Sequence, residues 1–188
     1  MDTKGQAAKP VMTDAGIRAR TGKGWEQWFA ALDKAGADAL DHKGITAILH
    51  EKMDVGPWWG QMIAVSYERA RGLRAMNQKC DGQFAVSVSR TLPVRLSTLY
   101  EAVADEKHRK KWFPNGPFKV SSETKNKYFR GAWGKNGARL EVGFYAKGDD
   151  KAQIVLQVNK LEGPKFVEAE RALWKEALAR LGVLVAGK

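Results

Sequence analysis

The sequence predicts an α+β protein: an N-terminal three-helix unit, followed by a helix-grip domain, a curved antiparallel sheet packed on a long C-terminal helix. Two observations predict it. Apolar residues recur with the helical period between residues 25 and 72, and with the alternating period of strands after residue 82. The last segment returns to the helical period, as expected of an amphipathic helix that covers one face of a sheet.

The N-terminal half begins with residues 1–24, which show little periodicity and which we expect to form a flexible basic arm. Three helices are predicted across residues 25–72. The second follows an N-cap at Asp41, and the third starts at Pro57, a residue favoured in the first turn. The third helix is apolar on more than one side, so we expect it to be mostly buried.

Residues 73–81 are predicted to be a connector, and residues 82–185 the sheet-and-helix domain. Alternation and helical periodicity give its expected elements in order: a strand at 83–92, helices at 93–105 and 105–113, strands at 118–124, 126–133, 138–147 and 151–161, and a helix from 164 to about 183. A single antiparallel sheet packed on the last helix would bury all of their apolar faces.

Charge is unevenly distributed along the chain. The net charge is +11 and the isoelectric point about 9.8, so an anionic partner has to be considered. Residues 82–163 hold fifteen basic and eight acidic residues, whereas residues 25–72 are mildly acidic. No stretch approaches the length of an apolar membrane span, and the N-terminus lacks a signal-like apolar region. We expect a cytoplasmic protein.

Three stretches carry a resemblance to a known family: TLPVRLSTLYEAVADEKHRKKWFPNGPF, ARLEVGFYAKGDDKAQIVLQVNKLEG and the final helix with Trp174. They resemble the START-like (SRPBCC) superfamily, in particular the branch that includes activators of the heat-shock-protein-ninety ATPase. The residues that match the pattern of that branch are Val94, Tyr100, Asp105, Trp112 and Pro114. The resemblance covers about residues 82–185. The helices at 25–72 resemble a bacterial helical domain often fused in front of such a domain, which implies no activity.

The resemblance implies a cavity between the sheet and the last helix that holds an apolar ligand. Between Phe118 and Lys147 the chain is short for this family, so the cavity is expected to be small or filled. Six aromatic residues are the candidates to line it, and the alternative is that they are simply core: Tyr100, Trp112, Phe113, Trp133, Phe144 and Trp174.

The segment EKHRKKWFPNGPF, residues 106–118, allows two interpretations. In the first, cations neutralise phosphates of a nucleic acid and an aromatic side chain stacks on bases. The candidate residues are Lys107, Arg109, Lys110, Lys111, Lys127 and Arg130. In the second, Trp112 and Phe113 turn inward where the helix ends, and the lysines form a solvated face. The second agrees with the closing pattern of the family.

Catalytic and metal-binding signatures are not recognisable. The histidines are His42, His50 and His108, with no HExxH or CxxC spacing, and Cys80 is the single cysteine. We expect no metal and no cofactor. If the protein were an enzyme, Glu141 or Tyr100 would be the candidate acid or base. We assign no catalytic residue.

Two functions therefore follow from the sequence. The first is non-catalytic binding of a small apolar ligand or a protein partner by the START-like domain. The second, from another class, is a basic nucleic-acid- or ribosome-associated protein that uses residues 107–139 and the N-terminal arm.

Overall fold

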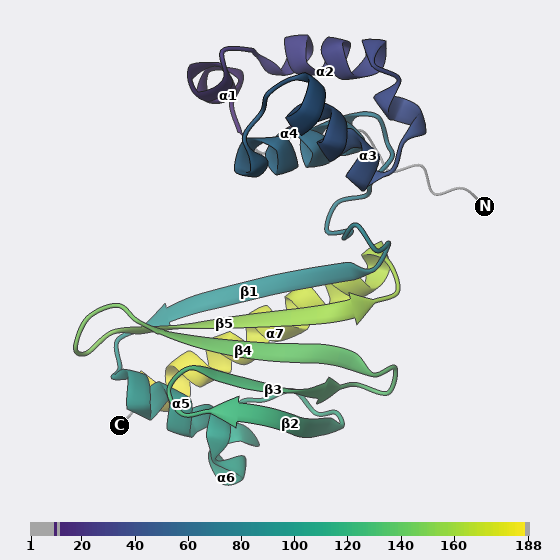
Figure 1. Cartoon of the computed structure of the whole chain (residues 1–188). Helices are drawn as coiled ribbons and strands as arrows, with labels where there is room; N and C mark the ends of the chain where they lie inside the picture. Colours follow the sequence, from purple (N-terminus) through teal and green to yellow (C-terminus); the bar gives the residue numbers. More distant parts are fainter. Residues whose placement is uncertain (1–9, 11, 187–188) are drawn as a thin grey trace. The chain divides into compact units, whose positions relative to one another are not determined.

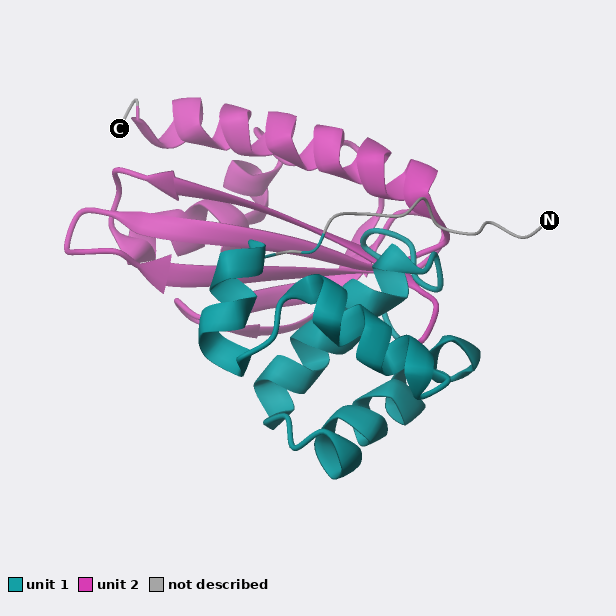
Figure 2. Cartoon of the chain, turned by 90° about the horizontal axis from the view of Figure 1, so that it is seen from above, with its two compact units in different colours: residues 1–80 teal, residues 81–188 magenta. Residues whose placement is uncertain are grey.

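The computed structural model describes residue 10 and residues 12–186. The chain divides into two compact units, residues 1–80 and residues 81–188, which Figure 2 distinguishes by colour. Each unit has its own apolar core.

The N-terminal unit is helical. Its α-helices are α1 (Asp14–Thr21), α2 (Trp25–Lys34), α3 (His42–Ala47) and α4 (Pro57–Ala70), and its shorter elements are η1 (Ala37–Ala39) and the π-helical η2 (Ile48–Lys52), into which α3 continues (Figure 1). Pro57 occupies the first turn of α4, and the Asp41 side chain accepts a hydrogen bond from the Gly44 amide at 2.8 Å. The three predicted helices are present, the second of them as α3 and η2 together.

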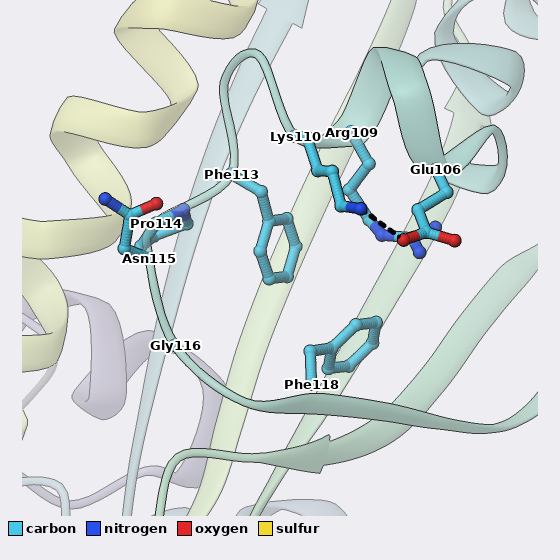
Figure 3. Close-up of a pocket in the computed structure, with 8 residues that line it drawn as sticks. All are labelled: Glu106, Arg109, Lys110, Phe113, Pro114, Asn115, Gly116 and Phe118. Carbon is cyan, nitrogen blue, oxygen red and sulfur yellow. Dashed lines mark ion pairs between the residues drawn. The ribbon is translucent and has the colours of Figure 1, made fainter.

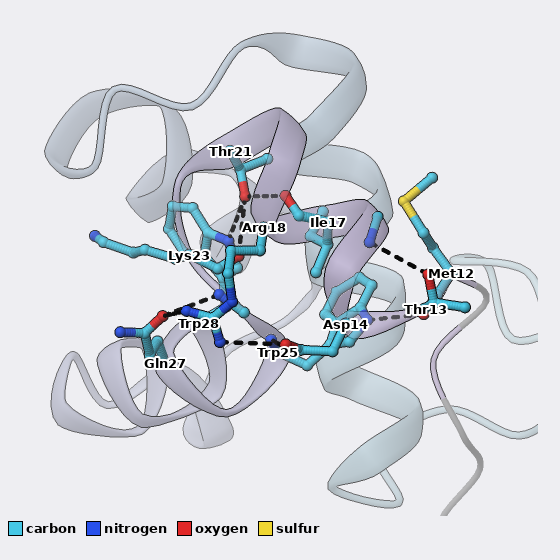
Figure 4. Close-up of polar contacts among 12 residues, drawn as sticks. Met12, Thr13, Asp14, Ile17, Arg18, Thr21, Lys23, Trp25, Gln27 and Trp28 are labelled. Atoms are coloured by element: carbon cyan, nitrogen blue, oxygen red, sulfur yellow. Dashed lines mark hydrogen bonds and ion pairs between the residues drawn. The ribbon is translucent and has the colours of Figure 1, made fainter.

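Helix α1 corrects the prediction of an arm over residues 1–24. Thr13 caps this helix by accepting a hydrogen bond from the Gly16 amide, and Ile17 is fully buried. Asp14 Oδ1 accepts a hydrogen bond of 2.7 Å from the Trp25 amide, which joins α1 to the start of α2 (Figure 4). That hydrogen bond holds the pKa of Asp14 below its usual value. Residues 1–9 and 11 of the predicted arm lie outside the described residues.

The core of the N-terminal unit combines one face of each helix. The buried apolar residues are Ile17, Trp25, Trp28, Leu32, Ala37, Ile45, Ile48, Leu49, Val55, Ile63, Ala64 and Tyr67. The Tyr67 hydroxyl donates a hydrogen bond of 2.8 Å to Asp33, and Arg71 pairs with the same carboxylate. This contact fastens the end of α4 to the end of α2.

The C-terminal unit is a five-stranded antiparallel sheet with three helices. Its elements in chain order are β1 (Phe84–Leu92), α5 (Leu96–Ala104), α6 (Glu106–Arg109), β2 (Phe118–Thr124), β3 (Tyr128–Trp133), β4 (Ala138–Ala146), β5 (Ala152–Leu161) and α7 (Pro164–Ala186). The strand order is β1-β5-β4-β3-β2. This is the α+β helix-grip architecture predicted from the sequence.

Helix α7 packs along the inner face of the sheet (Figure 1). Alternate strand residues such as Val86, Leu140 and Leu156 are buried on this face, and α7 buries Trp174, among others, against it. At each of these positions the period-two pattern of the strand places the apolar side chain inward. Among the described residues, no helix has the length and apolar character needed to cross a membrane.

Candidate functional site

The basic segment turns inward directly after α6. The Asp105 side chain accepts a hydrogen bond of 2.8 Å from the His108 amide and so caps the helix. Trp112 is then fully buried, and its indole N–H donates a hydrogen bond of 2.8 Å to the carbonyl oxygen of Ala102 in α5. The Arg180 side chain on α7 donates to the carbonyl oxygen of Trp112 at 3.2 Å. The cationic stretch is therefore anchored by its first aromatic residue.

Phe113 is the centre of an aromatic cluster between the sheet and α7. Its ring centroid lies 5.3 Å from Trp112, 5.1 Å from Phe118, 5.6 Å from Trp133 and 4.9 Å from Trp174. Trp112, Trp133 and Trp174 are almost completely buried, whereas Phe113 is half-buried. These rings occupy space that the family resemblance assigned to a ligand.

Tyr100 and Phe144 form a separate pair with centroids 5.4 Å apart. Both side chains are buried. Burial, and a smaller effect of Glu123, raise the pKa of Tyr100, so its hydroxyl stays protonated and a poor base at neutral pH. The structure thus divides the six candidate aromatic residues into two groups.

One carboxylate accepts hydrogen bonds from two of the buried tryptophans. Glu170 on α7 accepts hydrogen bonds from the Trp174 indole N–H at 2.7 Å and from the Trp133 indole N–H at 3.1 Å. Because an unpaired buried N–H is costly, this carboxylate fixes the orientation of both rings. Glu170 lies four residues before Trp174 on α7. This spacing in the sequence could have indicated that Glu170 contacts Trp174.

A pocket with a volume of about 400 Å³ opens beside this cluster (Figure 3). Its lining residues come from α6, the following loop and the start of β2: Glu106, Arg109, Lys110, Phe113, Pro114, Asn115, Gly116 and Phe118. All of them belong to the segment 106–118. Of these, Phe113 was among the residues that the sequence proposed for ligand binding.

The apolar part of the pocket is the pair Phe113 and Phe118. Their rings are tilted by 38°. Two glycines make this arrangement possible. A Cβ on Gly131 would lie 2.6 Å from the Phe118 ring and 2.4 Å from the carbonyl oxygen of Lys119, and a Cβ on Gly116 would lie 2.9 Å from the Trp133 ring. Phe118 therefore rests on bare backbone of β3.

The polar part of the pocket comes from α6. The Lys110 ammonium pairs with the Glu106 carboxylate at 2.6 Å, and this pairing lowers the pKa of Glu106. Arg109 lies over the rings of Phe118 and Phe129 and donates hydrogen bonds to the carbonyl oxygens of Val103 and Ala104. Arg109 therefore connects the α5–α6 region to the sheet. Lys110 contacts only Glu106 among the ion pairs of the described residues, and its side chain is exposed.

The six cations proposed for nucleic acid do not form one surface. Arg109 and Lys110 line the pocket, and Lys107 and Lys111 are exposed on and just after α6. Arg130 lies on the sheet and pairs with Glu141 at 3.3 Å. Lys127 is exposed in the turn between β2 and β3.

Glu141, His42 and His50, which could serve as acids or bases, each have a polar partner outside the pocket. Glu141 pairs with Arg130. His42 contacts Glu68 and Gln61, and His50 contacts the carbonyl oxygen of Val55. Cys80 is exposed. Within the part of the chain that the structure describes, no group of three or more His, Cys, Asp or Glu side chains is placed to hold a metal ion.

Comparison with known proteins supplies structural neighbours and no sequence relative. No protein-family model and no curated protein matches the chain. DynU16, a protein of the dynemicin biosynthetic locus, matches with a TM-score of 0.47 and 16% identity, over 54% of this chain and 47% of its own length. The chain therefore spans about half the length of that protein.

Two further solved structures match over more of their own length. For the Aha1 dimer from Colwellia psychrerythraea, the TM-score is 0.45 and the identity 15%, over 52% of this chain and 92% of that protein. For CalU16 from Micromonospora echinospora the values are 0.48 and 14%, over 55% and 76%. At these TM-scores and identities, the functions of those proteins cannot be transferred to this chain. Its fold is described from its own sheet and α7.

Proposed function

We propose that the C-terminal unit binds a small, mainly apolar ligand with an anionic group in the pocket beside α6. The observation that carries this proposal is the placing of the Phe113 and Phe118 rings opposite Lys110 in one pocket of about 400 Å³. This volume lies within the range of roughly 300–1,000 Å³ usual for small-molecule pockets, and the lining combines apolar residues with charged and amide side chains.

The pocket fits this class of ligand better than a wholly apolar one. The aromatic rings are suited to an apolar body, and the Lys110 ammonium is suited to an acidic group. Glu106 now neutralises Lys110, so an anionic group would compete with Glu106 for that ammonium. We propose binding without catalysis. Among the described lining residues, the one carboxylate is Glu106, and it is paired with Lys110.

The space between the sheet and α7, where the family resemblance implies a cavity, is not where we place the ligand. Trp112, Trp133 and Trp174 pack against Phe113 in that space, and two of them are held by Glu170. Reaching it would require breaking those hydrogen bonds. The pocket beside α6 is accessible as it stands.

A fluorescence titration with anilinonaphthalene sulfonate tests the proposal, because this probe combines fused rings with one negative charge. Lys110→Gln is expected to weaken binding about two- to fivefold, the range for an exposed charge pair. Glu106→Gln frees Lys110 and is expected to strengthen binding. Lys111→Gln is the matched control, since Lys111 is exposed and not part of the pocket lining.

The proposal fails if the wild-type chain does not bind the probe, or if Lys111→Gln weakens binding as much as Lys110→Gln. Either result would mean that general attraction to a basic protein, rather than this pocket, governs any binding.

A further inference from the structure

The two faces of the sheet differ in chemistry. Figure 1 views the sheet from its outer face, with α7 behind it. On β1 and β5 this outer face carries hydroxyl and amide side chains, namely Ser87, Ser89, Thr91, Gln153 and Gln157, which the strand register places in adjacent rows. Such groups can donate and accept hydrogen bonds and carry no charge.

On β2, β3 and β4 the same face is cationic. Lys119, Arg130 and Arg139 lie on it, in rows fixed by the pairing of Lys119 with Ala132 and of Ala132 with Arg139. Glu141 is the one carboxylate at an outward position of the described strands, and it is paired with Arg130. The outer face therefore has an excess of positive charge with no carboxylate left unpaired.

Two tyrosines border a shallow hollow of about 230 Å³ on this face. Tyr145 is 52% exposed, and Gly143 leaves room for its ring, because a Cβ there would lie 3.0 Å from the tyrosine oxygen. The Arg130 guanidinium lies 4.1 Å from the centre of the Tyr128 ring. Lys127 also contributes to the rim. The volume of the hollow is below that of a typical small-molecule site.

We propose that this outer face binds single-stranded nucleic acid. Bases would stack on Tyr145 and on the stacked pair of Tyr128 and Arg130, and phosphates would be held by Arg139 and Lys127. Exposed aromatic rings next to cations on an open surface are the features with which proteins hold single strands with little sequence preference. The small hydroxyl side chains of β1 leave the neighbouring part of this face free of bulky groups.

The charge pattern favours a polyanion over a protein partner. An acidic protein surface needs cations alone to be recognised. Here two tyrosine side chains stand among the cations, beside Val155. Beside α6 the arrangement differs. Trp112 is fully buried, the half-buried Phe113 and Phe118 rings line the pocket, and Lys110 is paired with Glu106.

Fluorescence anisotropy of the full chain with a fluorescein-labelled oligothymidylate tests the proposal. Binding is expected to weaken as salt rises, by about 0.7 in the logarithm of affinity per phosphate contact for each tenfold increase in salt. Tyr145→Ala is expected to weaken binding roughly tenfold, the loss of one stacked base. Tyr145→Phe keeps a ring at this position and is expected to bind like the wild type. Arg139→Gln is expected to reduce both affinity and salt dependence.

Lys107→Gln and Lys111→Gln are the controls, because both lysines are exposed near α6 and away from the outer face. Unchanged binding in these two variants supports the assignment. Three results would overturn it: no binding by the wild-type chain, a loss in the α6 variants equal to that in Arg139→Gln, or equal affinity of Tyr145→Ala and wild type. Lys110→Gln distinguishes this proposal from the ligand pocket. It is expected to weaken binding of the fluorescent probe and to leave binding of the oligonucleotide unchanged.

Discussion

The indole N–H of Trp112 donates a hydrogen bond of 2.8 Å to the carbonyl oxygen of Ala102, ten residues earlier in the chain. Trp112 has no exposed surface, although five consecutive residues with basic side chains, Lys107–Lys111, come directly before it. This contact agrees with the second interpretation of the segment 106–118 as far as Trp112 is concerned. The ring is part of the core and is not available to stack on a base.

Replacing Trp112 by Phe tests the strength of that anchor. The variant leaves the Ala102 carbonyl oxygen without its partner and a void beside Phe113, so we expect the C-terminal unit to lose about 2–4 kcal/mol of unfolding free energy. Urea titration, read by hydrogen exchange in peptides of β3 and β4, measures the loss. Lys111→Gln should leave the same peptides unchanged, and an equally stable W112F chain would show that the anchor is dispensable.

Gly131 and Gly143 offer a matched pair on neighbouring strands. Gly131→Ala places a Cβ against the backbone oxygen of Lys119 and against Phe118, so we expect a loss of about 1–3 kcal/mol and a reshaped pocket. Gly143→Ala meets only the end of the exposed Tyr145 side chain, which can move. Thermal unfolding of both variants checks this difference. Equal stability of the two variants would contradict the close approach of Phe118 to β3.

Glu170→Gln tests the carboxylate that holds two indoles. An amide has one acceptor oxygen in place of two and can present an N–H to an indole N–H, so we expect a loss of about 1–3 kcal/mol. Near-ultraviolet circular dichroism of the tryptophans should change as well. Glu168→Gln on the same helix is the control, because Glu168 is exposed and its ion pair is with Arg171 on the surface of α7. A spectrum identical to that of the wild type would count against the shared hydrogen bonds.

Alkaline pH should destabilise the N-terminal unit through Tyr67. Burial, strengthened by the hydrogen bond to Asp33, raises the pKa of Tyr67 above its ordinary value of 10.0. The folded unit keeps this hydroxyl protonated at a pH where the unfolded chain ionises it, so stability is complete below pH 10.0 and falls as pH rises through the raised pKa.

Tyr67→Phe removes that titration. The variant is expected to be less stable at neutral pH by about 1 kcal/mol, for the lost hydrogen bond to Asp33, yet to lose less stability than wild type above pH 10.0. Urea unfolding of both chains across this range, read in peptides of α4, gives the comparison. Parallel pH profiles would show that Tyr67 is not the titrating group.

The sequence was sufficient for most elements of the C-terminal unit, because β1, β4 and β5 alternate and α5 and α7 each bury an apolar side. The helix predicted over 105–113 is shorter, since α6 spans Glu106–Arg109 and buries no residue. The sequence was insufficient for α1, which buries only Ile17 and is held by a contact between Asp14 and Trp25, eleven residues apart. Local periodicity contains no information about such a contact. A helix with one buried residue gives almost no periodic signal.

The same limit applies to the pocket. The segment 106–118 was recognised from its cations and aromatic residues, but Phe118 was assigned to a strand without a partner. Its place over Gly131 follows from the pairing of β2 with β3, which has an irregularity between Val120 and Ser122. Register across strands is a tertiary property. Large aromatic residues were therefore proposed for the site, and the structure places most of them in the core.

The most direct test of the ligand pocket is an amide NMR titration of the full chain with anilinonaphthalene sulfonate. Binding beside α6 predicts saturable shifts confined to residues 106–118 and to β3 near Gly131, and smaller shifts at equal probe concentration in Lys110→Gln. Shifts that instead centre on the N-terminal unit, or that spread over the chain without saturation, would contradict the assignment of this pocket as the binding site.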